Sequence, residues 1–97
     1  MIFEWDPAKN LSNFKKHGFD FAEAEELFRG VLIVDADTRE DYGEKRWTGI
    51  GVIRARAAHV VFTERLPETI RIISLRKATR REKKQYEAAI QDRLEED

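Results

Sequence analysis

The 97-residue sequence contains no cysteine, only 2 prolines and 5 glycines, and no long apolar run. The absence of cysteine excludes a disulfide framework and thiolate chemistry. The 2 histidines, His17 and His59, are too widely spaced to predict a metal site. Because proline and glycine are too few for a low-complexity linker, we expect a single domain over residues 1–97 that needs no metal and no other cofactor.

Apolar stretches are also short. None approaches the roughly 18 residues that a helix needs to span a bilayer. The first residues, MIFEWDPAKN, lack the basic and apolar regions of a signal peptide. We therefore expect a soluble, cytoplasmic protein with no membrane partner. A chain of this length buries only about 60 to 65% of its unfolded surface on folding, so a permanent partner would add stability.

The first third of the sequence predicts a short strand and two helices that pack as a hairpin. Asp6 and Pro7 are typical of a helix N-terminus, because the carboxylate accepts from free backbone N–H groups and proline needs no partner there. Gly18 predicts the end of this helix. Asp20 and Glu23 have the spacing of a second capping pair, which predicts the start of the next helix.

The middle of the sequence changes to a strand pattern. The aliphatic run at 31–34 predicts a strand, and the acidic segment 35–44, DADTREDYGE, predicts a solvated loop. Three further strands are predicted at 45–53, 58–64 and 69–76. Short connections between consecutive strands favour antiparallel pairing, so these strands should form a meander.

The last element predicted is a C-terminal helix. Thr79 and Glu82 have the spacing of a capping box, and Tyr86, Ile90 and Leu94 recur on one face of the helix. The order is a strand, two helices, an antiparallel meander and a helix. The sequence therefore predicts an α+β fold.

Positive charge gathers in the segment 71–86, RIISLRKATRREKKQY. Seven basic residues stand there against one acid, Glu82, although the whole chain has 18 Lys and Arg against 19 Asp and Glu. A local cluster of one sign favours a polyanionic partner. Strand alternation predicts that Arg71 and Arg76 face opposite ways unless the strand carries a bulge.

Four segments together resemble one known family. They are FEWDPAKN, FKKHGFDFAEAEELF, GEKRWTGIG and RIISLRKATRREKKQY, which cover about the whole chain in order. The chain is similar to the BrnT family of bacterial type II toxins. This resemblance implies a RelE-like fold, a ribonuclease that cleaves RNA and halts translation, and a BrnA-type antitoxin whose ribbon-helix-helix domain binds operator DNA. One departure is Leu75, where the family usually has alanine; alternation predicts that it faces away from Arg76.

Cleavage of RNA without a metal requires deprotonation of the 2′-hydroxyl, stabilisation of the charged phosphate and protonation of the leaving 5′-oxygen. Arg76 at the end of a strand suits phosphate binding, because a fixed guanidinium can donate two hydrogen bonds. His17, Arg46 and Tyr86 are the other candidate catalytic residues, and the resemblance favours a role for Tyr86. The residues expected to position RNA are Lys77, Arg80, Arg81 and Lys84.

Each candidate also has a structural interpretation. His17 can simply occupy the end of a helix without a function, Arg46 can be a solvated or paired sheet residue, and Arg76 can form a structural salt bridge. Tyr86 can belong to the apolar face of its helix, and we interpret His59 as structural. The same basic cluster also fits a non-catalytic nucleic-acid-binding or co-repressor module, or an interaction domain that docks an acidic partner, because basic residues alone do not distinguish binding from cleavage.

Overall fold

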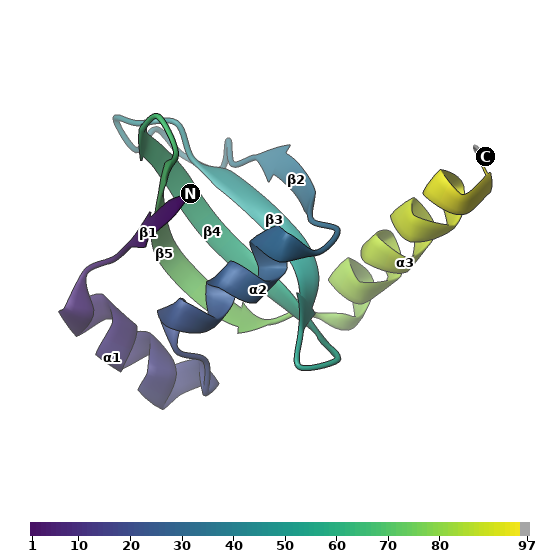
Figure 1. Cartoon of the computed structure of the whole chain (residues 1–97), viewed down its shortest axis with the longest axis horizontal. Coiled ribbons are helices and arrows are strands. Elements are labelled where there is room, and N and C mark those ends of the chain that lie inside the picture. Colours follow the sequence, from purple (N-terminus) through teal and green to yellow (C-terminus); the bar gives the residue numbers. More distant parts are fainter. Residues whose placement is uncertain (96–97) are drawn as a thin grey trace.

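The computed structural model describes residues 1–95 as a five-stranded sheet with helices (Figure 1). Its elements in chain order are β1 (Ile2–Glu4), α1 (Pro7–His17), the 3₁₀ turn η1 (Phe21–Glu23), α2 (Ala24–Arg29), β2 (Ile33–Ala36), β3 (Trp47–Ile53), β4 (Arg56–Leu66), β5 (Thr69–Lys77) and α3 (Arg80–Glu95). The predicted α+β class and element order are confirmed. Among these residues, no helix is both long and apolar enough to cross a membrane.

The strands lie in the order β1-β5-β4-β3-β2. Strands β2 to β5 pair antiparallel, as predicted, whereas β1 pairs parallel with β5. The β3–β4 turn consists of Arg54 and Ala55, which both have positive φ, at 50° and 65°. Two residues of this kind match the right-handed twist of a hairpin, so β4 starts earlier than predicted.

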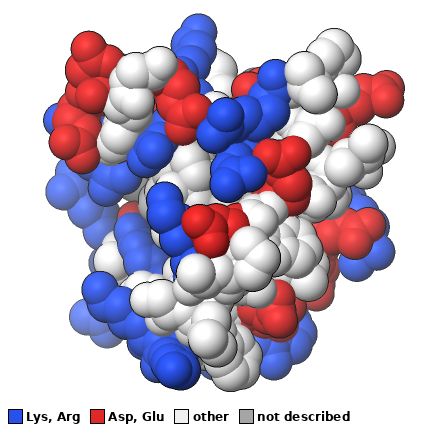
Figure 2. All heavy atoms as spheres, turned by 90° about the vertical axis from the view of Figure 1, so that its left-hand side faces the viewer, with Lys and Arg blue, Asp and Glu red and all other residues white. Residues whose placement is uncertain are grey.

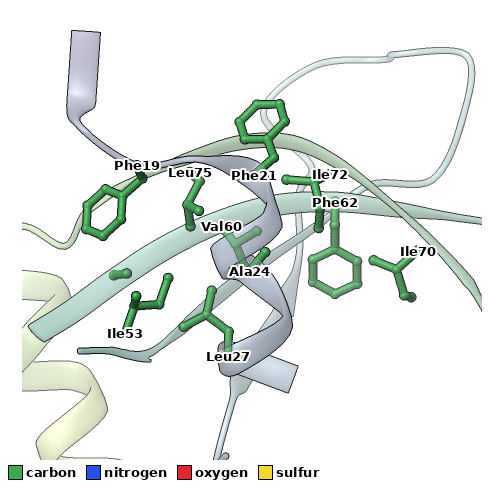
Figure 3. Close-up of a cluster of buried hydrophobic side chains, with 11 residues drawn as sticks. Phe19, Phe21, Ala24, Leu27, Ile53, Val60, Phe62, Ile70, Ile72 and Leu75 are labelled. Atoms are coloured by element: carbon green, nitrogen blue, oxygen red, sulfur yellow. The ribbon is translucent and has the colours of Figure 1, made fainter. Parts of the chain in front are cut away.

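Helices α1 and α2 pack on the sheet, α1 against β5 and α2 against β3 (Figure 1). The predicted helical hairpin is wrong in this respect, because each helix packs on a strand of the sheet and not on the other helix. Helix α2 does so with the buried Ala24 and Leu27, whereas on α1 only Asn13 is buried and Leu11 and Phe14 are 57% and 50% exposed. Figure 3 shows the resulting core. It includes Phe19, Phe21, Ala24 and Leu27 from the helical segment and Ile53, Val60, Phe62, Ile70, Ile72 and Leu75 from the sheet.

Helix α1 also covers the edge of β5 through one side chain. The Asn13 amide Nδ2 donates to the Leu75 carbonyl at 2.7 Å, and the Leu75 N–H donates to Asn13 Oδ1 at 3.2 Å. Asn13 thereby replaces a neighbouring strand at this point of an otherwise open edge. Leu75 itself is fully buried on the helix-covered face, which confirms that it faces away from Arg76.

Helix α3 starts at the end of β5 and runs away from the sheet (Figure 1). Its predicted capping box is present: the Thr79 N–H donates to Glu82 Oε1 at 2.8 Å, and the Glu82 N–H donates to Thr79 Oγ1 at 3.1 Å. None of its residues is buried, and Leu94 is 67% exposed. Of the apolar face predicted for this helix, Tyr86 and Ile90 are therefore partly buried and Leu94 is exposed in the chain alone.

Candidate functional site

Arg76 and Glu82 form the central ion pair of the open sheet face, opposite α1 and α2. Arg76 Nη1 donates to Glu82 Oε1 at 2.8 Å, and Nη2 donates to Oε2 at 2.9 Å. These hydrogen bonds lower the pKa of Glu82 from 4.5 to about 2. The carboxylate therefore stays ionised at physiological pH, and the guanidinium presents two parallel N–H groups to an anion.

His59 lies directly beside this pair on β4, in register with Arg76. Its Nε2 is 3.6 Å from Glu82 Oε2, and its side chain is only 9% exposed. Its Nδ1 is buried and makes no hydrogen bond within the described chain. Burial, together with the positive charge of Arg76, outweighs the nearby carboxylate and lowers the pKa of the imidazole.

A cavity of about 310 Å³ opens beside the ion pair, between the sheet and the first turns of α3. Its lining residues are Ile33, Asp35, Thr48, Ile50, His59, Glu82 and Gln85. This volume falls at the lower end of the range of about 300–1,000 Å³ that is typical of ligand pockets. The lining combines aliphatic side chains with the polar His59, Thr48 and Gln85 and the carboxylates of Asp35 and Glu82, so it is not a purely apolar pocket.

A second hollow lies between α1 and the outer edge of β5. It has a volume of about 270 Å³ and is lined by Lys9, Ser12, Asn13, Lys16, His17, Ile73 and Ser74. Ser74 precedes Arg76 by two positions on the same strand. His17 thus borders the second hollow, whereas Glu82, the partner of Arg76, lines the first cavity. The two lysines of α1 make this second hollow positively charged.

Two comparisons with known proteins bear on this arrangement. Residues 5–82 match the family described as the ribonuclease toxin, BrnT, of type II toxin-antitoxin systems. The chain belongs to the BrnT family. It is also similar to the crystal structure of the Brucella abortus ribonuclease toxin, BrnT, with a TM-score of 0.66 and 30% sequence identity over 82% of this chain and 100% of that chain. No curated protein matches the sequence.

In this BrnT family member a β-bulge changes the predicted direction of Arg71. The register shifts between Val61 and Phe62, so that Arg71 pairs with Thr63 and Arg76 pairs with His59. Cross-strand partners share a face, and Thr63 and His59 are both odd positions of β4, so the two arginines lie on the same open face. Arg71 Nη1 donates to Glu4 on β1 at 2.8 Å and is thus engaged at the other end of the strand.

Arg46 is not brought to the Arg76 side of the sheet. Trp47 pairs with Phe62, three positions along β4 from the partner of Arg76, which corresponds to about 10 Å. The Arg46 guanidinium lies over the Tyr42 ring, 4.1 Å from its centroid, and its Nε donates to Glu44 at 3.2 Å. In the described structure Arg46 therefore holds the loop before β3.

The same loop contains an ion pair between the buried Asp37 carboxylate and the exposed Arg39 side chain. Asp37 accepts two hydrogen bonds from the Arg39 side chain, both at 2.8 Å, and one from the Tyr42 hydroxyl at 3.2 Å. The Arg39 hydrogen bond lowers the pKa of Asp37 to about 2. The acidic loop predicted from the sequence is therefore fixed at its start by Asp37 and is not simply solvated.

Tyr86 does not line the cavity; it contacts the segment before β2. Its hydroxyl donates to the Val31 carbonyl at 3.0 Å, which ties α3 to the segment before β2. The basic residues of the BrnT C-terminal segment point outwards: Lys77 is exposed at the end of β5, and Arg80, Arg81 and Lys84 border a shallow hollow of about 610 Å³ along α3. The four predicted catalytic residues thus do not converge on one point.

Figure 2 views the side of the molecule that carries α1 and β1, and shows Lys and Arg interspersed with Asp and Glu. Charges of both signs therefore share that face. Within residues 1–95, no group of three or more His, Cys, Asp or Glu side chains is arranged to hold a metal ion.

From the sequence we interpreted His59 as structural, and the sequence did not draw attention to Lys9 or Lys16. His59 alternates with core residues, and only the β4–β5 register reveals that it faces Arg76 and Glu82. Glu82 was recognisable as the one acid among seven basic residues. Its spacing from Thr79 predicted the helix cap but not the ion pair with Arg76. Lys9 and Lys16 are seven residues apart on α1, a spacing that places them on one helix face and that could have drawn attention to them together with His17.

Proposed function

We propose that the chain is a metal-independent endoribonuclease, the toxin of a type II system, which cleaves RNA in the cytoplasm and thereby inhibits translation. The observation that carries this proposal, together with family membership, is the Arg76 guanidinium, held at a cavity with two N–H groups aimed at two anionic oxygens. Phosphate oxygens accept hydrogen bonds from arginine in the same two-pronged way.

The reaction is an attack of the 2′-oxygen on the adjacent phosphorus. The new O2′–P bond forms as the P–O5′ bond breaks, which leaves a 2′,3′-cyclic phosphate; the 2′-hydroxyl loses its proton to a base, and the 5′-oxygen gains one from an acid. Arg76 stabilises the charge on the five-coordinate phosphate. His17 is our candidate for proton transfer, because it borders the neighbouring hollow on β5.

Arg46 and Tyr86 stay candidates in this proposal, but neither side chain is free to contact RNA in the structure as it stands. Both are engaged by other groups, Arg46 by Tyr42 and Glu44 and Tyr86 by the Val31 carbonyl, and must leave those partners to reach RNA. The RNA backbone is positioned by exposed basic side chains, those of Lys77, Arg80, Arg81 and Lys84. Such contacts raise affinity without discriminating between sequences.

We further propose that a BrnA-type antitoxin covers the segment 71–86 and the exposed face of α3. The uncovered Leu94 and the absence of buried residues on α3 support a partner at this helix. A stable complex would bury at least about 1,200 Å² in total. The ribbon-helix-helix part of the antitoxin would then contact operator DNA in the major groove.

A cleavage assay on the purified chain tests the enzymatic proposal. RNA should be cut in the presence of EDTA and leave 2′,3′-cyclic or 3′-phosphate ends, whereas DNA of the same sequence, which lacks the 2′-hydroxyl, should stay intact. Complete loss of cleavage in EDTA, with recovery on addition of a divalent ion, contradicts the mechanism. Tight RNA binding without any cleavage would instead support the non-catalytic nucleic-acid-binding module.

A further inference from the structure

The Glu82 carboxylate occupies a position lined with hydrogen-bond donors. It accepts from Arg76 Nη1 and Nη2 at 2.8 and 2.9 Å and from the Thr79 backbone N–H at 2.8 Å. This position is at the N-terminus of the 16-residue helix α3, where the helix dipole also favours an anion. Donors from a strand, a connecting residue and a helix end thus converge on one negatively charged group.

The imidazole of His59 adds a further polar group on the β4 side of this position. Its side chain is more than nine-tenths buried, its Nδ1 has no partner in the described structure, and its Nε2 approaches Glu82 only to 3.6 Å. Burying an imidazole with so little compensation costs free energy. A ligand with more oxygen atoms than a carboxylate could bring one of them within hydrogen-bond distance of Nε2.

We infer that Arg76, the Thr79 backbone N–H and His59 Nε2 form a phosphate-binding site, and that the Glu82 carboxylate occupies it until an RNA phosphate displaces it. The identity of RNA as the natural ligand rests on the proposed function, but the site itself does not. Carboxylate and phosphate both accept two hydrogen bonds from one guanidinium, so one can replace the other on Arg76.

Glu82 can withdraw from this position. Its side chain is 19% exposed, and the cavity of about 310 Å³ lies beside it, so the carboxylate can turn away without displacing core residues. With a pKa of about 2, Glu82 remains an anion at physiological pH. It is consequently a constant competitor for Arg76 and a poor proton acceptor, so its role is to occupy the site and not to act as general base.

Titration with inorganic phosphate tests the site without any need for RNA cleavage. The readouts are the NMR resonances of the His59 ring nitrogens and of Arg76 Nε, recorded at constant ionic strength. Glu82→Gln should bind phosphate about tenfold more tightly than the native chain, because a neutral amide is a weaker competitor for Arg76. The glutamine oxygen can still accept from the Thr79 N–H, which preserves the helix cap.

Glu87→Gln is the matched control, since it removes the same charge from the exposed surface of the same helix. It should leave phosphate affinity unchanged within about twofold, because surface charges so exposed are screened. An equal rise in phosphate affinity in both variants overturns the inference. It is also overturned if the His59 and Arg76 resonances of the native chain do not move at saturating phosphate. Binding at this site in a chain that never cleaves RNA supports the inference and contradicts the proposed nuclease. Cleavage of RNA without any phosphate-induced shift of these resonances supports the proposed nuclease and contradicts the inferred phosphate site.

Discussion

Two arginines of β5 have similar ion pairs and different surroundings. Arg71 and Arg76 lie on the same open face, and each donates to a carboxylate at 2.8 Å. Arg71 links β5 to Glu4 on β1, whereas Arg76 pairs with Glu82, which lines the cavity together with His59. The chain thus allows a comparison between an arginine that joins two strands and the arginine that we propose to bind phosphate.

We expect Arg76→Ala to lower the cleavage rate by about 100-fold or more, because removal of one donor to a charged transition state typically has this effect. Arg71→Ala should retain the cleavage rate of the folded protein. Lys84→Ala should mainly weaken RNA binding and reduce its salt dependence. Single-turnover kinetics at several salt concentrations separate these effects. Small and equal losses in all three variants would indicate an undifferentiated basic patch and not a catalytic arginine.

At this scale the sequence drew attention to Arg76 but not to the residues that surround it in the fold. Arg76 was recognisable because it ends a strand inside a basic segment. Its contact with His59 depends on the register of β4 against β5, and the bulge that reorients Arg71 depends on the same pairing. Such pairings follow from how the whole sheet packs, which local alternation does not determine.

At the scale of elements, the contact between α2 and β3 depends on a glycine. A Cβ atom at Gly51 would lie 2.8 Å from Leu27 Cδ2 and 3.4 Å from the Val31 backbone oxygen. Leu27 is fully buried, so its methyl group has little space to move into. Gly51 is therefore needed for the close approach of the helix and not for an unusual backbone angle.

Gly51→Ala should lower the free energy of unfolding by about 1–3 kcal/mol, as expected for overpacking in a core. Gly30→Ala is the control, because its new methyl group would meet nothing closer than the Glu26 carbonyl at 3.9 Å. It should change stability by no more than about 0.5 kcal/mol. Urea unfolding followed by circular dichroism measures both. A Gly51→Ala variant as stable as the control would mean that α2 shifts freely on the sheet.

Helix ends were the most predictable features of the chain. The caps at Asp6, Asp20 and Thr79 are all present, because each depends only on residues two or three positions away. The β3–β4 turn was placed less well. Arg54 and Ala55 adopt positive φ there without a glycine or asparagine to signal it. The packing of α1 and α2 on the sheet was missed because amphipathic helices do not specify which apolar surface covers them.

At the scale of the whole molecule, three groups make stability depend on pH in the same direction. The pKa values of Asp37 and Glu82 fall from 3.8 and 4.5 to about 2 on folding, and the pKa of His59 falls below 6.5. Each group therefore binds protons more readily in the unfolded chain. Stability should be complete above pH 6.5 and decrease as the pH falls.

Urea unfolding between pH 7.5 and pH 2.5 should show two phases of loss. The first begins below about pH 6.5 as unfolded His59 takes up a proton, and the second begins below about pH 4.5 as the unfolded carboxylates do. Glu82→Gln should flatten the second phase, and Glu87→Gln should not. If stability rose on acidification, a protonated His59 paired with Glu82 would be the dominant form, contrary to the burial that we describe.

The parallel pairing of β1 with β5 also governs when the molecule can be completed during its synthesis. The Glu4–Arg71 ion pair joins residues 67 positions apart, so β1 lacks its neighbouring strand until that further length of chain has been made. At about 5–20 residues per second this interval lasts about 3–13 s. Arg76 and Glu82 are translated later still. A nascent chain therefore cannot assemble the candidate site during this interval, and it lacks the activity that we propose until Glu82 has been added.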